Sequence, residues 1–386
     1  MGANLFLELL QVSVGNRDSL SRVPSDVEWE QLFSEAQRHA ITGMMACGID
    51  RLPREQQPPK VVRVQWAGQV LQIEQRNLEM TGACSNLCRR LEQDGFYCCV
   101  LKGQANHAYY PQGMGTRRNS GDIDIWVVPE KGDASKFNAY SNPVWQTVEY
   151  AQEKLGMTGL CWLHASGDVG GLPVEVHFHP SFFSRPKYNR RFKKHFSDIT
   201  VCVEMKTVDG VEIPAMKVDK DVVYQMNHIY RHLIDEGVGL RQIVDYFYCL
   251  KTYGLRLKEG ALTPSRESIM RTVEYLGMKR FAGALMYVLR EVLGMSGEYL
   301  LCEPSVKDGQ FLVDEILLSG NFGHKDPRMN TLSSEGGYFS QRFNQAARRF
   351  KRNLRFVSSY PGEVFWEPIV RVEHFVWKKL KLWRWR

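Results

Sequence analysis

Apolar residues recur at intervals of three and four along two long stretches of the chain, and this spacing predicts helices. The first stretch runs from about Asp26 to Gly95, with breaks at Pro53 and at the pair Pro58 and Pro59. The second runs from about Asp219 to Gly294 and contains the segments DVVYQMNHIYRHLIDEG, LRQIVDYFYCLKTYG, SIMRTVEYLG and RFAGALMYVLREVLG. Between the two stretches the period changes, so we expect a compact unit that contains strands.

The middle region opens with the short apolar run FYCCVLKG, which ends in glycine and predicts a buried strand. QANHAYYP predicts a short helix closed by Pro111, and the glycine-rich QGMGTRRNSGD leads into a second strand, DIDIWVVP. A helix is expected around Trp145–Gly156, a strand near Leu160–Ala165, a turn at Gly170 and Gly171, and a strand over Pro173–Pro180. The expected fold class is α+β, a mixed β-sheet core flanked by helical regions. The expected divisions are a helical region 1–95, an α/β core 96–215, a helical domain 216–340 and a tail 341–386.

Composition narrows the class of protein but does not identify its function. The 386 residues are 44% hydrophobic and 24% charged, which is typical of a globular protein. The net charge of +7 belongs to the tail, because residues 341–386 hold 12 Lys and Arg against 3 Asp and Glu, whereas the rest holds 38 against 40. The sequence indicates no secretory signal and no transmembrane segment. The nine scattered cysteines do not suggest a disulfide framework, so we expect a cytoplasmic protein.

A pair of carboxylates at the start of the second strand is the main candidate for chemistry. Side chains two apart in a strand share a face, so Asp122 and Asp124 are expected to point together, while Ile123 and Ile125 point into the core. Two adjacent carboxylates repel each other unless a cation lies between them, and Mg²⁺ prefers such hard oxygen ligands. The same pattern also occurs on solvated edge strands, so the pair alone does not decide between the two interpretations.

The neighbouring segments favour a phosphate-binding site. Lys102 and Gly103 form a glycine-bounded turn before the predicted helix, where backbone N–H groups could hold phosphates. The basic loop Thr116–Gly121 follows and supplies Arg117, Arg118 and Ser120. Both arginines are expected to be exposed. A phosphate contact is slightly favoured for Lys102 over the alternative of an ordinary solvated lysine.

These motifs together resemble a known family. LKGxxxxxxYYP, then RRNSGDIDIWV and VEVHFHP, are similar to the uncharacterised bacterial nucleotidyltransferase family of the DNA polymerase beta-like superfamily, over roughly residues 30–260. The resemblance implies that Asp122 and Asp124 bind Mg²⁺, with Mn²⁺ as an alternative, and that Glu175 is the third catalytic and metal-binding carboxylate. The superfamily's usual Gly-Ser turn is replaced here by Lys102-Gly103-Gln104, so Lys102 or the loop arginines would have to contact the triphosphate.

Further polar residues are candidates for the nucleotide-binding site. On the strand VEVHFHP, Glu175 and His177 share a face with His179, which we interpret as structural. An unpaired Glu175 would be costly on an apolar strand, which favours a partner such as a metal. His228 shares a helix face with Arg231 and His232, and Arg241 lies four residues before Asp245 on the next helix. The family resemblance places these helices at the nucleotide cleft, whereas a hydrogen-bonded helix pair is an equal alternative. Tyr109 and Tyr110 favour a core position.

The expected function is transfer of a nucleoside monophosphate from an NTP to an unidentified acceptor, with release of pyrophosphate. Three alternatives remain: a non-catalytic nucleotide-binding or scaffold protein, a kinase-like transfer of the γ-phosphate, and a protein that acts through its tail. RRFKRNLRF and FVWKKLKLWRWR interleave basic and aromatic residues, which suits packing on the body, an anionic membrane surface or a nucleic acid. Pro361 and Pro368 are expected to interrupt any long helix there.

Overall fold

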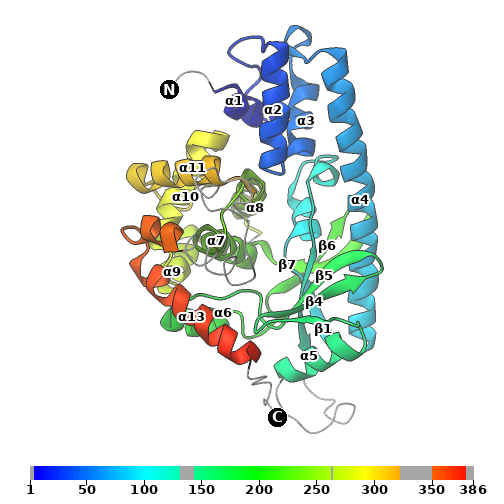
Figure 1. Cartoon of the computed structure of the whole chain (residues 1–386), viewed down its shortest axis with the longest axis vertical. Helices are drawn as coiled ribbons and strands as arrows, with labels where there is room; N and C mark the ends of the chain where they lie inside the picture. The colour runs from blue at the N-terminus through cyan, green and yellow to red at the C-terminus, as the bar shows by residue number, and fades with distance from the viewer. Residues whose placement is uncertain (1–3, 131–142, 262–263, 322–349, 380–386) are drawn as a thin grey trace, which may run out of the picture.

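The computed structural model describes residues 4–130, 143–261, 264–321 and 350–379. A group of helices forms one end of the molecule, a long helix runs along the sheet, and further helices lie on the sheet's other side (Figure 1). The parts of the predicted tail at 341–349 and 380–386 lie outside the described residues.

The predicted helical lead-in is confirmed. It consists of α2 (Asp26–Arg38), α3 (Thr42–Arg51) and the 34-residue α4 (Lys60–Gln93), with the short 3-10 helix η1 (Arg54–Gln56) between them. Ser25 and Glu28 form a capping box that fixes the start of α2. A helix that we did not predict, α1 (Leu5–Ser13), precedes them and packs its leucines into the same core.

Seven strands form one mixed sheet in the order β3-β4-β5-β2-β1-β7-β6. Only β2 with β5 and β1 with β7 pair in parallel; the other neighbours are antiparallel. The mixed α+β fold is therefore confirmed. The strands are β1 (Phe96–Val100), β2 (Ile123–Pro129), β3 (Gly159–Leu160), β4 (His164–Val169), β5 (Leu172–His177), β6 (Val203–Val208) and β7 (Val211–Met216).

Most predicted strands are present, with two corrections. The strand expected near Leu160–Ala165 is split into β3 and β4, and the β6–β7 hairpin was missed. Gly170 and Gly171 form the predicted turn, both with positive φ, and join β4 to β5. The run QANHAYYP forms the 3-10 helix η2 (Gly103–Tyr109), which ends before Pro111 as expected, and a second 3-10 helix, η3 (Gly115–Arg117), follows it.

The second predicted helical region is also confirmed. It contains α7 (Val218–Asp235), α8 (Leu240–Lys258), α9 (Arg266–Tyr275) and α10 (Lys279–Leu293). The predicted helix at Trp145 is α5 (Pro143–Glu153). Further elements, none of them predicted, are α6 (Pro186–His195), the 3-10 helix η4 (Gly297–Tyr299), α11 (Val306–Ser319) and α13 (Pro361–Lys379). Residues 350–356, before α13, are also helical.

Two hydrophobic cores hold these layers together. The smaller one lies between the sheet, α4 and α5, and includes Ile123 and Ile125, as their alternation predicts. The larger one joins the N-terminal helices to α7, α8 and α10. All nine cysteines are free thiols, which agrees with the absence of a disulfide framework. Among the described residues, no helix combines the length and the apolar character that a membrane span requires.

The prediction for Pro368 is wrong. Pro361 starts α13, but Pro368 lies inside this helix instead of ending it. Pro368 is exposed, so its ring points to solvent. Glu363, Val364 and Glu367 of this helix are buried against the body, and this packing helps to offset the backbone hydrogen bond that proline cannot make.

Candidate active site

Three carboxylates meet where β2 and β5 pair. The parallel register sets Asp124 directly beside Glu175, and Asp122 immediately precedes β2. Asp122, Asp124 and Glu175 each offer an oxygen atom, and these atoms lie within 4.8 Å of one another. Asp124 is buried, whereas the side chain of Asp122 is 38% exposed. The structure thus brings together the three carboxylates that we predicted, in a cluster that solvent reaches from the Asp122 side.

Lys102 neutralises part of this negative charge. Its Nζ lies 2.9 Å from Oδ2 of Asp124 and 3.7 Å from Oδ1 of Asp122. Burial alone would lower the pKa of Lys102, but the charges of the two aspartates outweigh it and raise the pKa above the ordinary lysine value. Lys102 is therefore a half-buried cation between two carboxylates, and the alternative that it is a solvated lysine is wrong.

Two histidines lie on the far side of the carboxylates. Nε2 of His177 is 2.9 Å from Oδ1 of Asp124 and 3.2 Å from Oε2 of Glu175. Nδ1 of His164 is 3.3 Å from the same glutamate oxygen. Burial would raise the pKa of Glu175, but the hydrogen bond from His177 and the charge of His164 lower it to about 2. Glu175 is therefore ionised at neutral pH.

His164 was missed by the sequence reasoning. It lies at the start of β4, and the antiparallel register places it beside His177 of β5. The two rings are 5.0 Å apart, and together with Glu175 they form a second group of potential ligand atoms within 4.8 Å. Only the strand register reveals this neighbour, because nothing in the local sequence pattern distinguishes it.

The basic loop differs from its prediction, because Arg118 is buried instead of exposed. Its guanidinium pairs with Asp245 of α8 through two hydrogen bonds, of 2.6 Å and 2.7 Å. The Tyr110 hydroxyl donates a further hydrogen bond to Asp245. Asp245 lies 127 residues away from Arg118 in the sequence. A carboxylate that accepts two hydrogen bonds from one guanidinium can stabilise an arginine in the protein interior. Arg118 also donates to the hydroxyl of Ser120.

Arg117 points away from Arg118. It forms ion pairs with Asp50 of α3 and Glu74 of α4, and its guanidinium is partly exposed beside these helices. It is not among the residues around the cavity next to the aspartates. The two arginines of the loop are therefore separated, and only one of them lies at the site.

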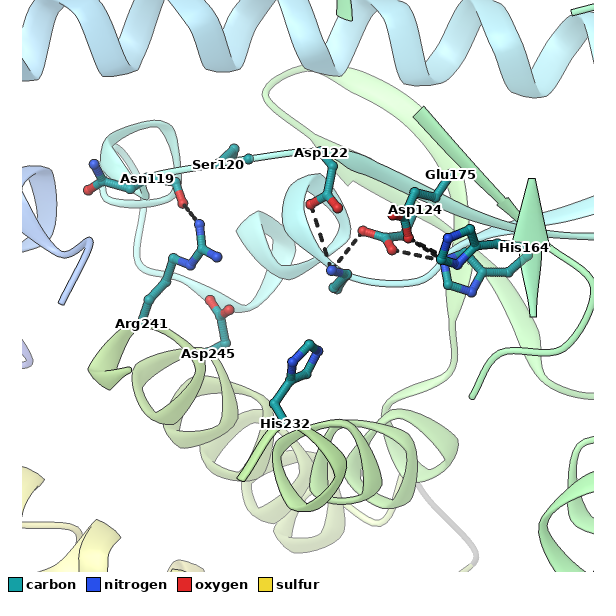
Figure 2. Close-up of polar contacts among 12 residues, drawn as sticks. Asn119, Ser120, Asp122, Asp124, His164, Glu175, His232, Arg241 and Asp245 are labelled. Carbon is teal, nitrogen blue, oxygen red and sulfur yellow. Dashed lines mark hydrogen bonds and ion pairs between the residues drawn. The ribbon is translucent and has the colours of Figure 1, made fainter. Parts of the chain in front are cut away.

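A narrow cavity opens beside Lys102 and Asp122. Its volume is 20 Å³, room for about one water molecule. Helices α7 and α8 face the carboxylates across it, and Figure 2 shows Arg241 and Asp245 on that opposite side. The lining includes seven residues that the sequence singled out: Lys102, Gly103, Arg118, Asp122, His228, Arg241 and Asp245.

Arg241 completes a group of cations around this cavity. Its Nη1 donates to the backbone carbonyl of Asn119, 2.8 Å away, which ties α8 to the loop before β2. Burial, and then the charge of Arg118, lower the pKa of Arg241 to about 10. The group is still charged at neutral pH, so Lys102, Arg118 and Arg241 surround the cavity with positive charge.

Of the three residues predicted to share a face of α7, only His228 lines this cavity, whereas Arg231 and His232 do not. His228 is buried and its ring is 4.3 Å from that of His232, while Arg231 reaches the ring of Phe182 on another side. Gln225, which was not predicted, also lines the cavity and donates to Oδ1 of Asn106. Gln225 lies one helical turn before His228, so the periodicity that identified His228 could have found it.

Tyr109 and Tyr110 are buried, as predicted. The hydroxyl of Tyr109 donates to Asp221 and accepts from Lys206, within the interior. His179 follows the end of β5, and burial lowers its pKa to about 4. None of these three residues is among those around the cavity.

A fold of this kind, with a carboxylate cluster facing buried cations, suits a substrate that carries phosphate groups. A family model described as uncharacterised nucleotidyltransferase matches residues 25–294, and the chain belongs to this family. No curated protein matches the chain. Among solved structures, the chain is similar to an antigenic nucleotidyltransferase-like protein from Paracoccidioides brasiliensis. That match has 11% identity and a TM-score of 0.35, and it covers 60% of this chain and 97% of the other.

Proposed function

We propose that this protein transfers a nucleoside monophosphate from an NTP to an acceptor hydroxyl or phosphate and releases pyrophosphate. The observation that supports this most is the cluster of Asp122, Asp124 and Glu175, whose oxygen atoms lie within 4.8 Å of one another beside a cavity lined by cations. Membership of a nucleotidyltransferase family supports the class of reaction.

The three carboxylates fit a divalent cation. They are hard oxygen donors, they meet on one side of the sheet, and Asp122 leaves them accessible to solvent. Asp122, Asp124 and Glu175 would hold Mg²⁺ or Mn²⁺. Such an ion, when bound, stabilises negative charge on a phosphate and lowers the pKa of an attacking hydroxyl.

Lys102 and Arg241 would bind the triphosphate. Lys102 already compensates the charge of the aspartate pair, and a bound cation would take over this role and leave the ammonium group for a phosphate. Arg241 faces the same cavity from α8. The cavity is too narrow for a nucleotide, so these two side chains would have to move outward as the triphosphate binds.

The acceptor would approach from the other side of Glu175. His164 lies beside Glu175 and also lines a separate cavity of 160 Å³, together with Trp162, Arg231 and Arg371. An engineered cavity of about 150 Å³ holds a benzene ring, so this volume suits a molecule the size of one ring. Glu175 is ionised and could accept a hydrogen bond from an acceptor hydroxyl.

Thermal unfolding with each of the four NTPs, with and without Mg²⁺, tests the proposed substrate. The proposal predicts that one or more NTPs raise the midpoint only when Mg²⁺ is present. Asp122→Asn should abolish this shift, and because Asp122 is partly exposed the variant should still fold. Asp18→Asn, an exposed carboxylate between α1 and α2, is the matched control and should respond like the wild type.

Analysis of the products separates the remaining alternatives. Release of pyrophosphate supports nucleotidyl transfer, whereas a nucleoside diphosphate together with a phosphorylated acceptor would indicate kinase-like transfer of the γ-phosphate. Stabilisation without turnover in the presence of a cell extract would favour a nucleotide-binding scaffold. The absence of any NTP effect in the wild type would refute the site assignment.

A further inference from the structure

The side of helix α13 that faces the protein carries acidic side chains, whereas an ordinary surface helix buries apolar ones. Glu363 and Glu367 are buried on this inner side. Oε2 of Glu363 accepts hydrogen bonds from the backbone N–H groups of Ser184 and Arg185. Glu367 accepts from Asn353 and pairs with Arg371 on its own helix. The helix is therefore held to the body largely through polar contacts.

The outer side of α13 is apolar and exposed. Phe365 and Val372 are 65% and 63% exposed, and Ile369, Phe375 and Val376 are exposed beside them. Their spacing of three and four residues places them on one face of the helix. One charged residue, the exposed Glu373, lies at the edge of this face, four residues after Ile369 and three before Val376. In Figure 1 the helix runs along the outside of the molecule.

Such a stripe differs from ordinary surface composition. Single exposed apolar residues are normal, whereas a contiguous apolar face marks a binding surface. Phe350 and Leu354, one turn apart in the helical residues before α13, are also exposed. Something must cover this surface for the arrangement to be favourable.

The charge of the adjoining sequence selects the occupant. Residues 378–386 contain five basic residues, Lys378, Lys379, Lys381, Arg384 and Arg386, and no acidic one. A second copy of the chain docked on α13 would bring two such clusters together, and their repulsion would oppose the pairing. An anionic lipid surface attracts the same charges, and Trp383 and Trp385 prefer the boundary between lipid and water.

We propose that α13 binds the surface of an anionic membrane, with its apolar face buried among the lipid headgroups and acyl chains. Phe365, Ile369, Val372 and Phe375 supply the apolar contact, and the net positive charge of residues 378–386 favours an anionic surface. The buried glutamates stay on the protein side and keep the rest of the molecule above the membrane.

Vesicle co-sedimentation of the full-length protein tests this proposal. The protein should sediment with vesicles of phosphatidylcholine and phosphatidylserine, and much less with pure phosphatidylcholine or at high salt. Phe365→Glu/Phe375→Glu should reduce binding at least about tenfold. Lys381→Gln/Arg384→Gln/Arg386→Gln should remove the preference for phosphatidylserine and weaken binding by about a hundredfold.

The matched control places the same charges on another exposed apolar site. Val61→Glu/Leu78→Glu changes two exposed residues of α4 and should sediment like the wild type. Circular dichroism checks that every variant is folded. Equal binding by the α13 variant and the wild type would overturn the proposal. So would a solution dimer that the α13 variant abolishes while vesicle binding is absent, because the occupant would then be a second copy.

Discussion

Replacement of Glu363 by glutamine tests how α13 is docked on the body. Glu363 is 7% exposed and accepts two backbone hydrogen bonds through a single carboxylate oxygen. Burial is the main cause of its pKa shift and raises the pKa from 4.5 to about 7, although the backbone donors oppose the shift. The folded state therefore binds this proton more tightly than the unfolded state does.

The sign and size of the effect follow from that shift. A raised carboxyl pKa gives a stabilising contribution that is complete below about pH 4.5 and is lost as the pH rises to about 7. A shift of this size corresponds to a loss of about 3 kcal/mol in the free energy of unfolding. Glutamine stays neutral and can still accept the hydrogen bonds from Ser184 and Arg185, so Glu363→Gln should lack this loss.

Urea unfolding at several pH values between about 5 and about 8 measures the difference between the two proteins. The histidines and other groups titrate in both, so their contributions cancel in the comparison. We expect Glu363→Gln to gain up to about 3 kcal/mol relative to the wild type as the pH rises. The reasoning is refuted if the difference stays constant with pH, or if the wild type gains stability over the variant.

Three further substitutions probe the site. Arg118→Met leaves Asp245 buried without its bidentate partner and should lower the free energy of unfolding, measured in urea, by about 3 to 5 kcal/mol. The double variant Arg118→Met/Asp245→Leu should recover part of this loss. A loss below about 1 kcal/mol in the single variant would contradict the buried pair. Lys102→Gln removes the cation between the aspartates, so it should tighten Mn²⁺ binding about tenfold in a spectroscopic titration and weaken NTP binding. Unchanged Mn²⁺ affinity would count against the proposed role of Lys102. Gly103→Ala places a side chain at a φ of 65° and should lower the free energy of unfolding by about 1 to 2 kcal/mol. We expect no larger loss, because the added carbon makes only an ordinary contact with the carbonyl oxygen of Asp122. Equal stability of the variant and the wild type would argue against the turn.

The sequence pattern predicted the elements that carry the carboxylates. Alternation around Asp122 and Asp124 identified β2, and the polar residues in VEVHFHP identified β5. The pattern could not show that these strands are parallel neighbours, which is what sets Asp124 beside Glu175. The prediction that the three carboxylates meet therefore rested on the family resemblance. The structure shows the strand register that brings them together.

The β6–β7 hairpin could have been found from local signals. Its strands alternate, and Asp209 and Gly210 between them both have positive φ, as a tight hairpin turn requires. Lys206 in one strand and Pro214 in the other weaken the strand pattern. Lys206 is nevertheless buried, where its ammonium group donates to the hydroxyl of Tyr109.

The burial of Arg118 could not be read from the sequence. A glycine-rich loop with two adjacent arginines is typical of an exposed segment. Only the tertiary fold brings Asp245 to Arg118 and draws one of the two arginines inside. His164 was missed for the same reason, because its contact with Glu175 depends on the pairing of β4 with β5.

We propose above all that a divalent cation and an NTP bind at Asp122, Asp124 and Glu175. Crystals of the full-length protein soaked with Mn²⁺ and a non-hydrolysable NTP analogue would test it most directly, since anomalous scattering locates manganese. Our account predicts a manganese peak among the three carboxylates, with the triphosphate on the side of Lys102 and Arg241. A nucleotide bound elsewhere, or manganese bound away from these carboxylates, would contradict it.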